Sequence, residues 1–177
     1  GPLALTDEVS MKLMDHIRKQ TEKDLAAEGK TVPQHPGFAV CEKLLAVNRP
    51  GKAAGAGFYE YPQGGTKFLW PELTTMFPQT TPLSQQEMID RMLIVQALDT
   101  VRCVEEGVLR SVADANIGSI FGWGFSPFNG GTLQFINGYG LNKLIARAKE
   151  LEAKYGERFS VPKLLQDKAD KGELFVD

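Results

Sequence analysis

Apolar side chains recur every three or four residues along most of the chain, and this spacing predicts a mainly helical protein. No segment alternates polar and apolar residues for long, so we expect no substantial β-sheet. The pattern predicts helices over residues 2–9, 10–27, 38–47, 84–106, 141–155 and 161–169, a helix that begins at 111, and a short helix within 71–77.

Two helix starts have a sharp local signal. Ser84 and Ser111 each precede an acidic residue by three positions, Glu87 and Asp114, which is the pattern of a capping box. Ser10 is predicted to cap the helix over 10–27 in a similar way. Glycines at the far ends, as at 29 and 107, are typical helix stops.

The stretch over 111–140 combines glycines with large aromatic residues. Glycine permits backbone angles that other residues rarely adopt, and aromatic side chains bury much surface. We therefore expect a tight, buried turn that joins two helices, with four side chains fixing it in the core: Phe121, Trp123, Phe125 and Phe128.

Part of this stretch matches the start of the chain, which predicts two related helical units. Residues 1–11 align with 131–141, and the pairs that agree are Gly1/Gly131, Leu3/Leu133, Asp7/Asn137 and, beyond them, Met14/Leu144 and Val32-Pro33 with Val161-Pro162. A long helix and the aromatic turn precede Gly131, whereas nothing corresponds to them before Gly1. We expect a fragment that begins inside its first unit, with one unit over 1–62, a linker containing a short helix over 63–83, and a second unit over 84–177.

Composition excludes some functions. The 177 residues carry a net charge of -2, which argues against binding nucleic acid through phosphate contacts. Hydrophobic residues make up 42%, yet no apolar run approaches the roughly 20 residues of a membrane helix. Cys41 and Cys103 are expected to be buried, reduced thiols, and with His16 and His35 they form no metal-ligand spacing.

Two charged groups have alternative interpretations. The glycine-rich segment over 48–61 is either a structural turn that delivers Phe58, Tyr59 and Tyr61 onto a helical surface, or a site where Arg49 and Lys52 meet an anion. Its glycines do not have the spacing of a phosphate-binding loop. On the helix over 84–106, Arg102 either joins an ion-pair network with Asp99 and Glu106 or faces a ligand.

Several motifs resemble one family. RCVEEG at 102–107, ADANIG at 113–118 and GWGFSPFNGG at 122–131 look like the C-terminal domain of 3-hydroxyacyl-CoA dehydrogenases. GPLALTDEV at 1–9, NRPGK at 48–52 and GAGFYEY at 55–61 look like the first of two tandem copies of that domain, as multifunctional β-oxidation proteins carry them. Together these motifs cover most of the chain in the family's order.

The resemblance implies an all-α fold like the C-terminal domain of 6-phosphogluconate dehydrogenase, in two units packed as an internal pseudo-dimer. It implies oxidation of a (3S)-3-hydroxyacyl-CoA by NAD. An absent N-terminal domain would bind the NAD, and a His–Glu pair in that domain would assist the oxidation. No catalytic, cofactor-binding or metal-binding residue is then expected in this chain. The expected substrate-binding residues, near the acyl tail, are Gly1, Pro2, Leu3 and Leu5.

The resemblance also implies partners, namely the acyl-CoA substrate, the protein's own NAD domain and a thiolase subunit, and it implies a location in a bacterial cytoplasm. A missing upstream helix would leave an apolar surface on the first unit. Alternatives are a non-enzymatic helical interaction module, or the helical domain of another NAD-dependent dehydrogenase. The chain departs from the family pattern at Ser10, Ser126, Thr132, Gln134 and Asn137.

Overall fold

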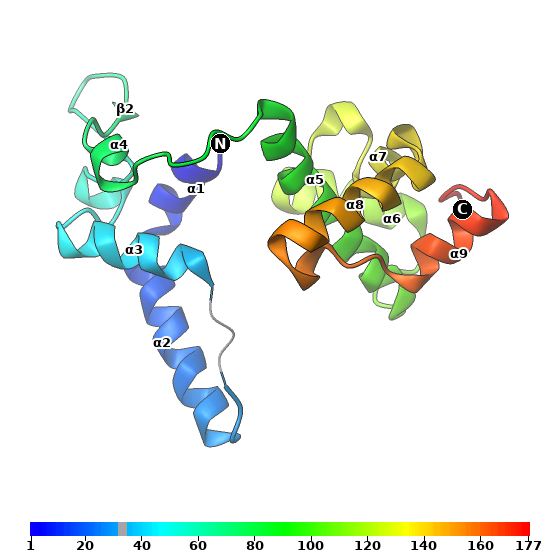
Figure 1. Ribbon diagram of the computed structural model, residues 1–177. Helices are drawn as coiled ribbons and strands as arrows, with labels where there is room; N and C mark the ends of the chain where they lie inside the picture. The colour runs from blue at the N-terminus through cyan, green and yellow to red at the C-terminus, as the bar shows by residue number, and fades with distance from the viewer. Residues whose placement is uncertain (32–34) are drawn as a thin grey trace. The chain divides into compact units, whose positions relative to one another are not determined.

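The computed structural model describes residues 1–31 and 35–177, which are mostly helical (Figure 1). The chain divides into two units, Gly1–Thr81 and Pro82–Asp177, and each is described by itself. The predicted match of Val32-Pro33 with Val161-Pro162 involves residues that lie outside the described ones.

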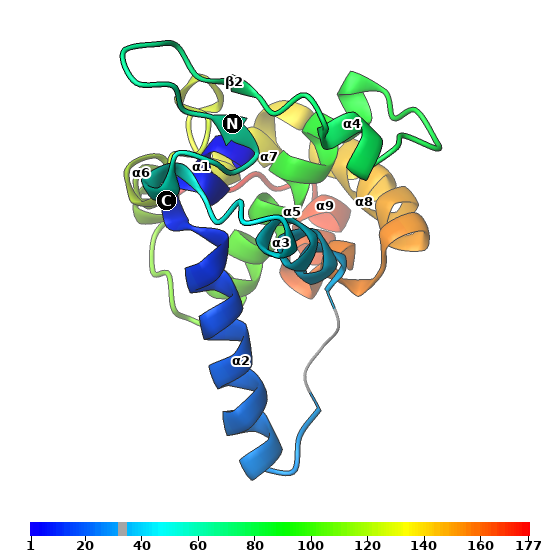
Figure 2. The ribbon, with the colours of Figure 1, turned by 90° about the vertical axis from the view of Figure 1, so that its left-hand side faces the viewer.

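The described residues of the first unit form four α-helices and a small hairpin. Helices α2 and α3 pack side by side, as Figure 2 shows. A two-stranded antiparallel sheet pairs Tyr59 with Leu69 and Glu60 with Phe68. The elements are α1 (Pro2–Val9), α2 (Met11–Ala27), α3 (Pro36–Ala46), the 3-10 turn η1 (Lys52–Ala54), β1 (Tyr59–Glu60), β2 (Phe68–Leu69) and α4 (Leu73–Met76).

The first unit has a small core. Met11, Leu44 and Phe58 are its buried members, and partly buried residues from α3, β1 and the segment over 70–77 pack around them. The segment predicted as a linker therefore contributes side chains to this core. Met14 and Ile17 of α2 lie outside this core, because they are 39% and 54% exposed.

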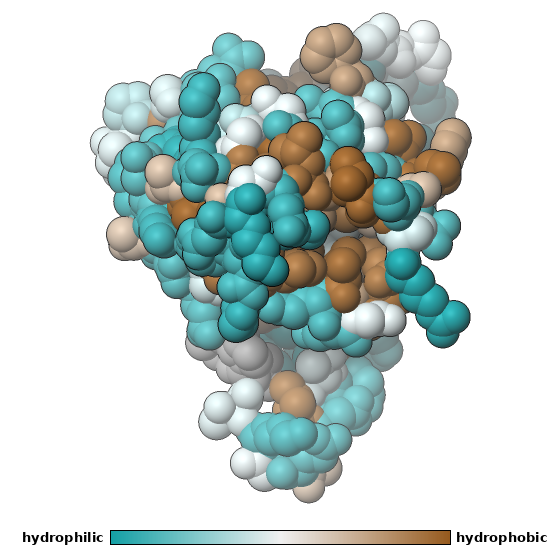
Figure 3. Space-filling model, turned by 90° about the vertical axis from the view of Figure 1, so that its right-hand side faces the viewer, coloured by the Kyte–Doolittle hydropathy of each residue, from teal (hydrophilic) through white to brown (hydrophobic). Residues whose placement is uncertain are grey.

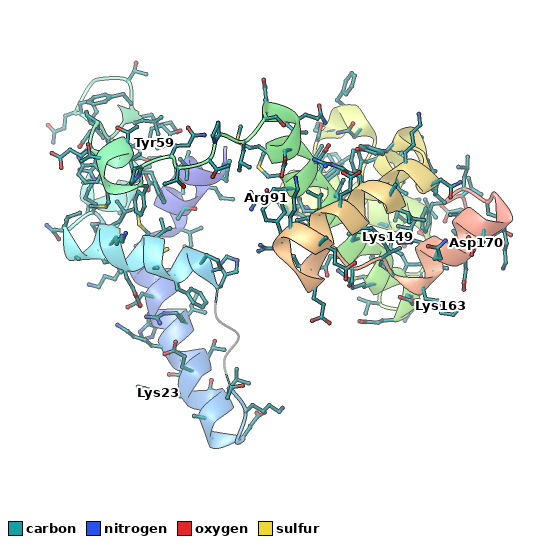
Figure 4. The ribbon with its side chains drawn as sticks, in the orientation of Figure 1. Lys23, Tyr59, Arg91, Lys149, Lys163 and Asp170 are labelled. Carbon is teal, nitrogen blue, oxygen red and sulfur yellow. The ribbon has the colours of Figure 1, made fainter. Side chains whose placement is uncertain are left out.

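The second unit is a bundle around one long helix. Helix α5 packs against α7, α8 and α9, and its residues Ile94, Leu98 and Val101 are fully buried. Figure 4 labels Arg91 on this helix, and its guanidinium lies 4.0 Å from the ring centre of Tyr155 on α8. The elements are α5 (Gln85–Glu105), α6 (Val112–Trp123), η2 (Pro127–Asn129), α7 (Thr132–Tyr139), α8 (Leu141–Tyr155), η3 (Glu157–Phe159) and α9 (Lys163–Lys171).

Two of the three predicted caps are present. The Ser84 hydroxyl accepts a hydrogen bond from the Glu87 amide at 3.1 Å, and Ser111 accepts one from the Asp114 amide at 3.0 Å. The prediction for Ser10 was wrong, because its side chain makes no capping hydrogen bond to α2. Its backbone has φ 77°, a left-handed conformation that turns the chain sharply between α1 and α2.

The prediction of four buried aromatic anchors over 111–140 was wrong for three of them. Phe125 is buried, but Phe121, Trp123 and Phe128 are 85%, 55% and 98% exposed. Helix α6 runs through Gly122 to Trp123, so two of these residues lie on its outer face, and η2 carries Phe128 outward. Figure 3 looks onto the second unit and shows hydrophobic surface interrupted by hydrophilic side chains.

Candidate functional site

Asp7 fastens helix α1 to the end of the glycine-rich segment. Its carboxylate is fully buried and accepts hydrogen bonds from the backbone amides of Phe58 at 2.8 Å and Tyr59 at 2.9 Å, and from the Tyr61 hydroxyl at 2.9 Å. A Cβ at Gly57 would lie 2.1 Å from a carboxylate oxygen, so only glycine fits there. We call these contacts the Asp7 latch. Burial, with the bond to Asp7, raises the pKa of Tyr61.

The charged residues of the glycine-rich segment are used within the unit, so the structural interpretation is favoured over the anion site. Arg49 donates to the carbonyls of Gly57 at 2.8 Å and Tyr59 at 3.2 Å, pairs with Glu60 at 2.8 Å, and lies over the ring of Trp70. Lys52 pairs with Glu8. Both cations thus hold the turn in shape.

The second unit contains an arrangement of the same kind. The Asn137 side chain accepts from the backbone amide of Phe175 at 3.0 Å and donates to its carbonyl at 2.9 Å. Phe175 is 2% exposed and Phe58 6%, so each latch seats a buried phenylalanine. Asn137 is the residue that the sequence alignment pairs with Asp7.

The helices that carry the two latches also agree in length and in the turn that follows them. Helices α1 and α7 both have eight residues. Ser10, which follows α1, has φ 77° and ψ 125°, and Gly140, which follows α7, has φ 88° and ψ 121°. Serine therefore occupies a conformation that glycine adopts at the matching place.

The four predicted substrate-binding residues lie together at the start of α1. Gly1 is its N-cap, and Pro2 begins it. All four residues are exposed, with exposed fractions of 39% for Leu3 and 64% for Leu5. In the second unit, the residues aligned with these two leucines, at 133 and 135, are buried. The start of α1 thus offers an apolar surface at the place where α7 is covered.

A groove lies between α2 and α3 in the first unit, with a volume of about 480 Å³. Its walls are mostly apolar, with a charged edge at Asp15 and Arg18. Burial, with the nearby Asp15 carboxylate, raises the pKa of the Cys41 thiol in its wall. The residues that line it are Thr6, Met14, Asp15, Ile17, Arg18, Thr21, His35, Gly37, Phe38, Val40, Cys41 and Phe58.

The remaining candidate residues have structural contacts. Arg102 donates to the Ser160 carbonyl at 2.8 Å and to its hydroxyl at 3.1 Å, and it pairs with Asp99 at 3.7 Å. These contacts favour a structural role over a ligand-facing one, but the predicted network is only partly formed, because no ion pair of Arg102 with Glu106 occurs among the described residues. His35 accepts from the Gly37 amide at the start of α3. Both cysteines are free thiols, but the prediction that they are buried was wrong, because each is only partly buried. Within residues 1–31 and 35–177, no group of three potential metal ligands occurs and no helix is long and apolar enough to cross a membrane.

The described residues do not fit a dinucleotide. Their sheet has two short antiparallel strands, whereas a dinucleotide fold places a glycine-rich turn after a parallel strand. The glycine-rich turn here surrounds the Asp7 carboxylate, which would repel a pyrophosphate.

From the sequence, no structural role was assigned to Asp7. The alignment of Asp7 with Asn137 was the sequence signal that could have indicated matching roles for the two residues.

No protein-family model matches the chain. The chain is 35% identical over 178 residues to the fatty acid oxidation complex subunit alpha of Vibrio cholerae serotype O1, covering 99% of this chain and 24% of that relative. Identity to the proteins of the same name is 33% in Shewanella loihica, over all of this chain and 25% of the relative, and 34% in Shewanella frigidimarina, over 99% and 24%. The chain spans about a quarter of the length of these curated relatives, and over that quarter it is similar to proteins named fatty acid oxidation complex subunit alpha.

Proposed function

We propose that this chain is the C-terminal helical part of an NAD-dependent (3S)-3-hydroxyacyl-CoA dehydrogenase in a multifunctional β-oxidation protein. The observation that carries the proposal is the match, over the whole chain, to subunits named for fatty acid oxidation. The dehydrogenase motifs at 102–107, 113–118 and 122–131 support this more specific activity. NAD and the catalytic His–Glu pair belong to another part of the longer polypeptide.

In this proposal the helical part forms one wall of the cleft that receives the acyl-CoA. The start of α1 contributes Gly1, Pro2, Leu3 and Leu5 to that wall, near the acyl tail. Their exposure supports this role, because an acyl chain gains free energy by covering apolar side chains. In this proposal the chain contributes binding and orientation of the substrate, and the catalytic groups lie in another part of the longer polypeptide.

The two units are proposed to be copies that pair as an internal pseudo-dimer in the intact protein. Three observations support their relationship: the equal lengths of α1 and α7, the matching turns at Ser10 and Gly140, and the paired latches at Asp7 and Asn137. Because the relatives are subunits of a complex, a thiolase is a further proposed partner.

The proposal is tested by measuring NADH formation by the intact protein with 3-hydroxyacyl-CoA substrates of several chain lengths. Leu5→Asp places a charge beside the acyl tail and is expected to raise KM by about tenfold or more, because a few lost apolar contacts are worth roughly 1–3 kcal/mol. Val47→Asp is the control, since Val47 is comparably exposed, at 46%, but lies after α3. Absence of NADH formation at every chain length would refute the proposed activity. Equal KM values for the two variants would refute the role of Leu5.

A further inference from the structure

Several residues that line the groove of the first unit align with residues that are buried in the second unit. Residues of α2 and α8 match when their numbers differ by 130, as Gly1 and Gly131 do. On that alignment Met14, Arg18 and Thr21 of the groove match three residues of α8 that are all fully buried: Leu144, Ala148 and Leu151.

Helix α5 covers that side of α8. The Arg147 Nε donates to the Asp90 carboxylate of α5 at 2.7 Å, and the Tyr155 hydroxyl donates to the Glu87 carboxylate at 2.5 Å. Arg147 is the residue of α8 that aligns with Ile17 of the groove, so the two surfaces correspond along their length. Helix α5 also packs on α9, which lies against α8. In the first unit α3 lies against α2 in the same way and forms the other wall of the groove.

We propose that the groove between α2 and α3 receives an amphipathic helix of the α5 kind, supplied by the same longer polypeptide from outside residues 1–177. The inference rests on the proposed relationship between the two units. The relatives match this chain over only 24% or 25% of their length, so most of their length lies outside the match and can supply such a helix.

The groove also indicates the chemistry of the helix. Its apolar walls at Met14, Ile17 and Phe38 require an apolar stripe. The Nε of Arg18 is buried and, among the described residues, has no hydrogen-bond partner. The two terminal nitrogens of Arg18 already pair with Asp15, Glu22 and Glu42 at 2.8 to 3.0 Å, so the Nε is the donor that lacks an acceptor. An unpaired buried donor is costly, so we expect the docking helix to place an uncharged acceptor, such as an amide oxygen, opposite this Nε. The Nε of Arg147 has its acceptor on α5, at Asp90.

The natural cysteines provide a direct test. Cys41 lines the groove, and Cys103 on α5 serves as an internal control in the second unit. Alkylation of each thiol is followed by mass spectrometry, in the 177-residue chain and in the intact protein, at one pH. The docked helix is expected to slow alkylation of Cys41 in the intact protein by about tenfold or more, with Cys103 changing by less than about twofold. Equal rates at Cys41 in the two proteins would overturn the proposal. So would a Cys41 rate in the 177-residue chain that falls with protein concentration, because a second copy would then fill the groove.

A pair of charged variants separates docking from general damage. Ile17→Glu lies in the groove and Leu13→Glu lies on the same helix outside it, and the two residues are 54% and 48% exposed. In the 177-residue chain both variants are expected to leave Tm within about 2 °C. In the intact protein Ile17→Glu is expected to lower Tm by about 4 °C or more and to restore alkylation of Cys41, whereas Leu13→Glu changes neither. Identical behaviour of the two variants in the intact protein would overturn the proposal. Neither measurement depends on dehydrogenase activity, so the docking helix and the proposed function fail independently.

Discussion

Removing the carboxylate of Asp7 is expected to destabilise the first unit strongly. Asp7→Ala deletes the acceptor for three hydrogen bonds at once, from the amides of Phe58 and Tyr59 and from the hydroxyl of Tyr61. The Phe58 bond is buried, whereas the other two are partly buried. Water can therefore replace the acceptor at Tyr59 and Tyr61 more readily than at Phe58.

The magnitude follows from that difference. Leaving the buried Phe58 amide unpaired costs about 1–3 kcal/mol. A bond to a charged acceptor contributes roughly 1.5–3 kcal/mol, but because water can replace the acceptor at Tyr59 and Tyr61, each of those two losses is reduced to roughly 0.5–1 kcal/mol. The expected loss is therefore about 3 kcal/mol of the free energy of unfolding of the first unit. Asp7→Asn keeps one acceptor but directs an amide donor at a second donor, so an intermediate loss is expected.

The two tryptophans allow the units to be followed separately. Trp70 packs against the core of the first unit, and Trp123 is 55% exposed in the second. In a Trp123→Phe background, urea unfolding followed by fluorescence reports on Trp70 alone. Glu8→Ala is the control, because Glu8 is an exposed neighbour of Asp7 on α1 whose ion pair with Lys52 is expected to contribute less than about 1 kcal/mol. A loss below about 1 kcal/mol for Asp7→Ala would refute the reasoning.

Three further predictions concern single side chains. Thr132→Val is expected to stabilise the second unit by about 1 kcal/mol in urea unfolding, because the Thr132 hydroxyl is buried without a partner among the described residues. Thr100→Val is the control, because it removes a hydroxyl that is hydrogen-bonded and should not stabilise the unit. Gly118→Ala should raise the free energy of unfolding of the second unit by about 0.5–1 kcal/mol, because the added Cβ meets open space on a helix. Gly131→Ala should instead make the unit unfold at a lower urea concentration, because its Cβ would lie 2.5 Å from a backbone atom. Between pH 9 and 11, Tyr61→Phe should reduce the loss of stability with rising pH. The pKa of Tyr61 is raised in the folded state, so above the ordinary value of 10.0 the folded protein keeps this proton while the unfolded chain releases it. The free energy of unfolding therefore falls as the pH rises past 10.0. An alkaline slope unchanged by Tyr61→Phe would contradict that assignment.

The sequence predicted the helices well where the signals are local. The capping serines at 84 and 111 and the helix-ending glycines at 29 and 107 act through nearby backbone groups, and the structure has all four in these roles. Helix α7 was not recognised within the aromatic stretch, because its Gly138 suggested a turn. Yet the alignment with residues 1–11, predicted to be helical over 2–9, already indicated it.

Burial was harder to predict than helix position. Phe121, Phe128 and Ile17 have large apolar side chains, but whether each is covered depends on segments distant in sequence, which local spacing does not reveal. Ser10 was predicted to cap a helix because its side chain suits that role, while its backbone conformation is imposed by the sharp turn between α1 and α2. The latch at Asp7 joins residues some 50 positions apart, so only the alignment with Asn137 hinted at it.

The central proposal is that residues 1–177 form the helical wall of a dehydrogenase whose redox groups lie elsewhere in a longer polypeptide. The most direct measurement is NADH formation from a (3S)-3-hydroxyacyl-CoA by the intact protein and by a form that lacks these residues but still binds NAD. The proposal predicts NADH from the intact protein and a loss of at least about 100-fold in kcat/KM in the shortened form, because one side of the acyl-CoA cleft is missing. Equal kcat/KM values in the two forms would contradict it.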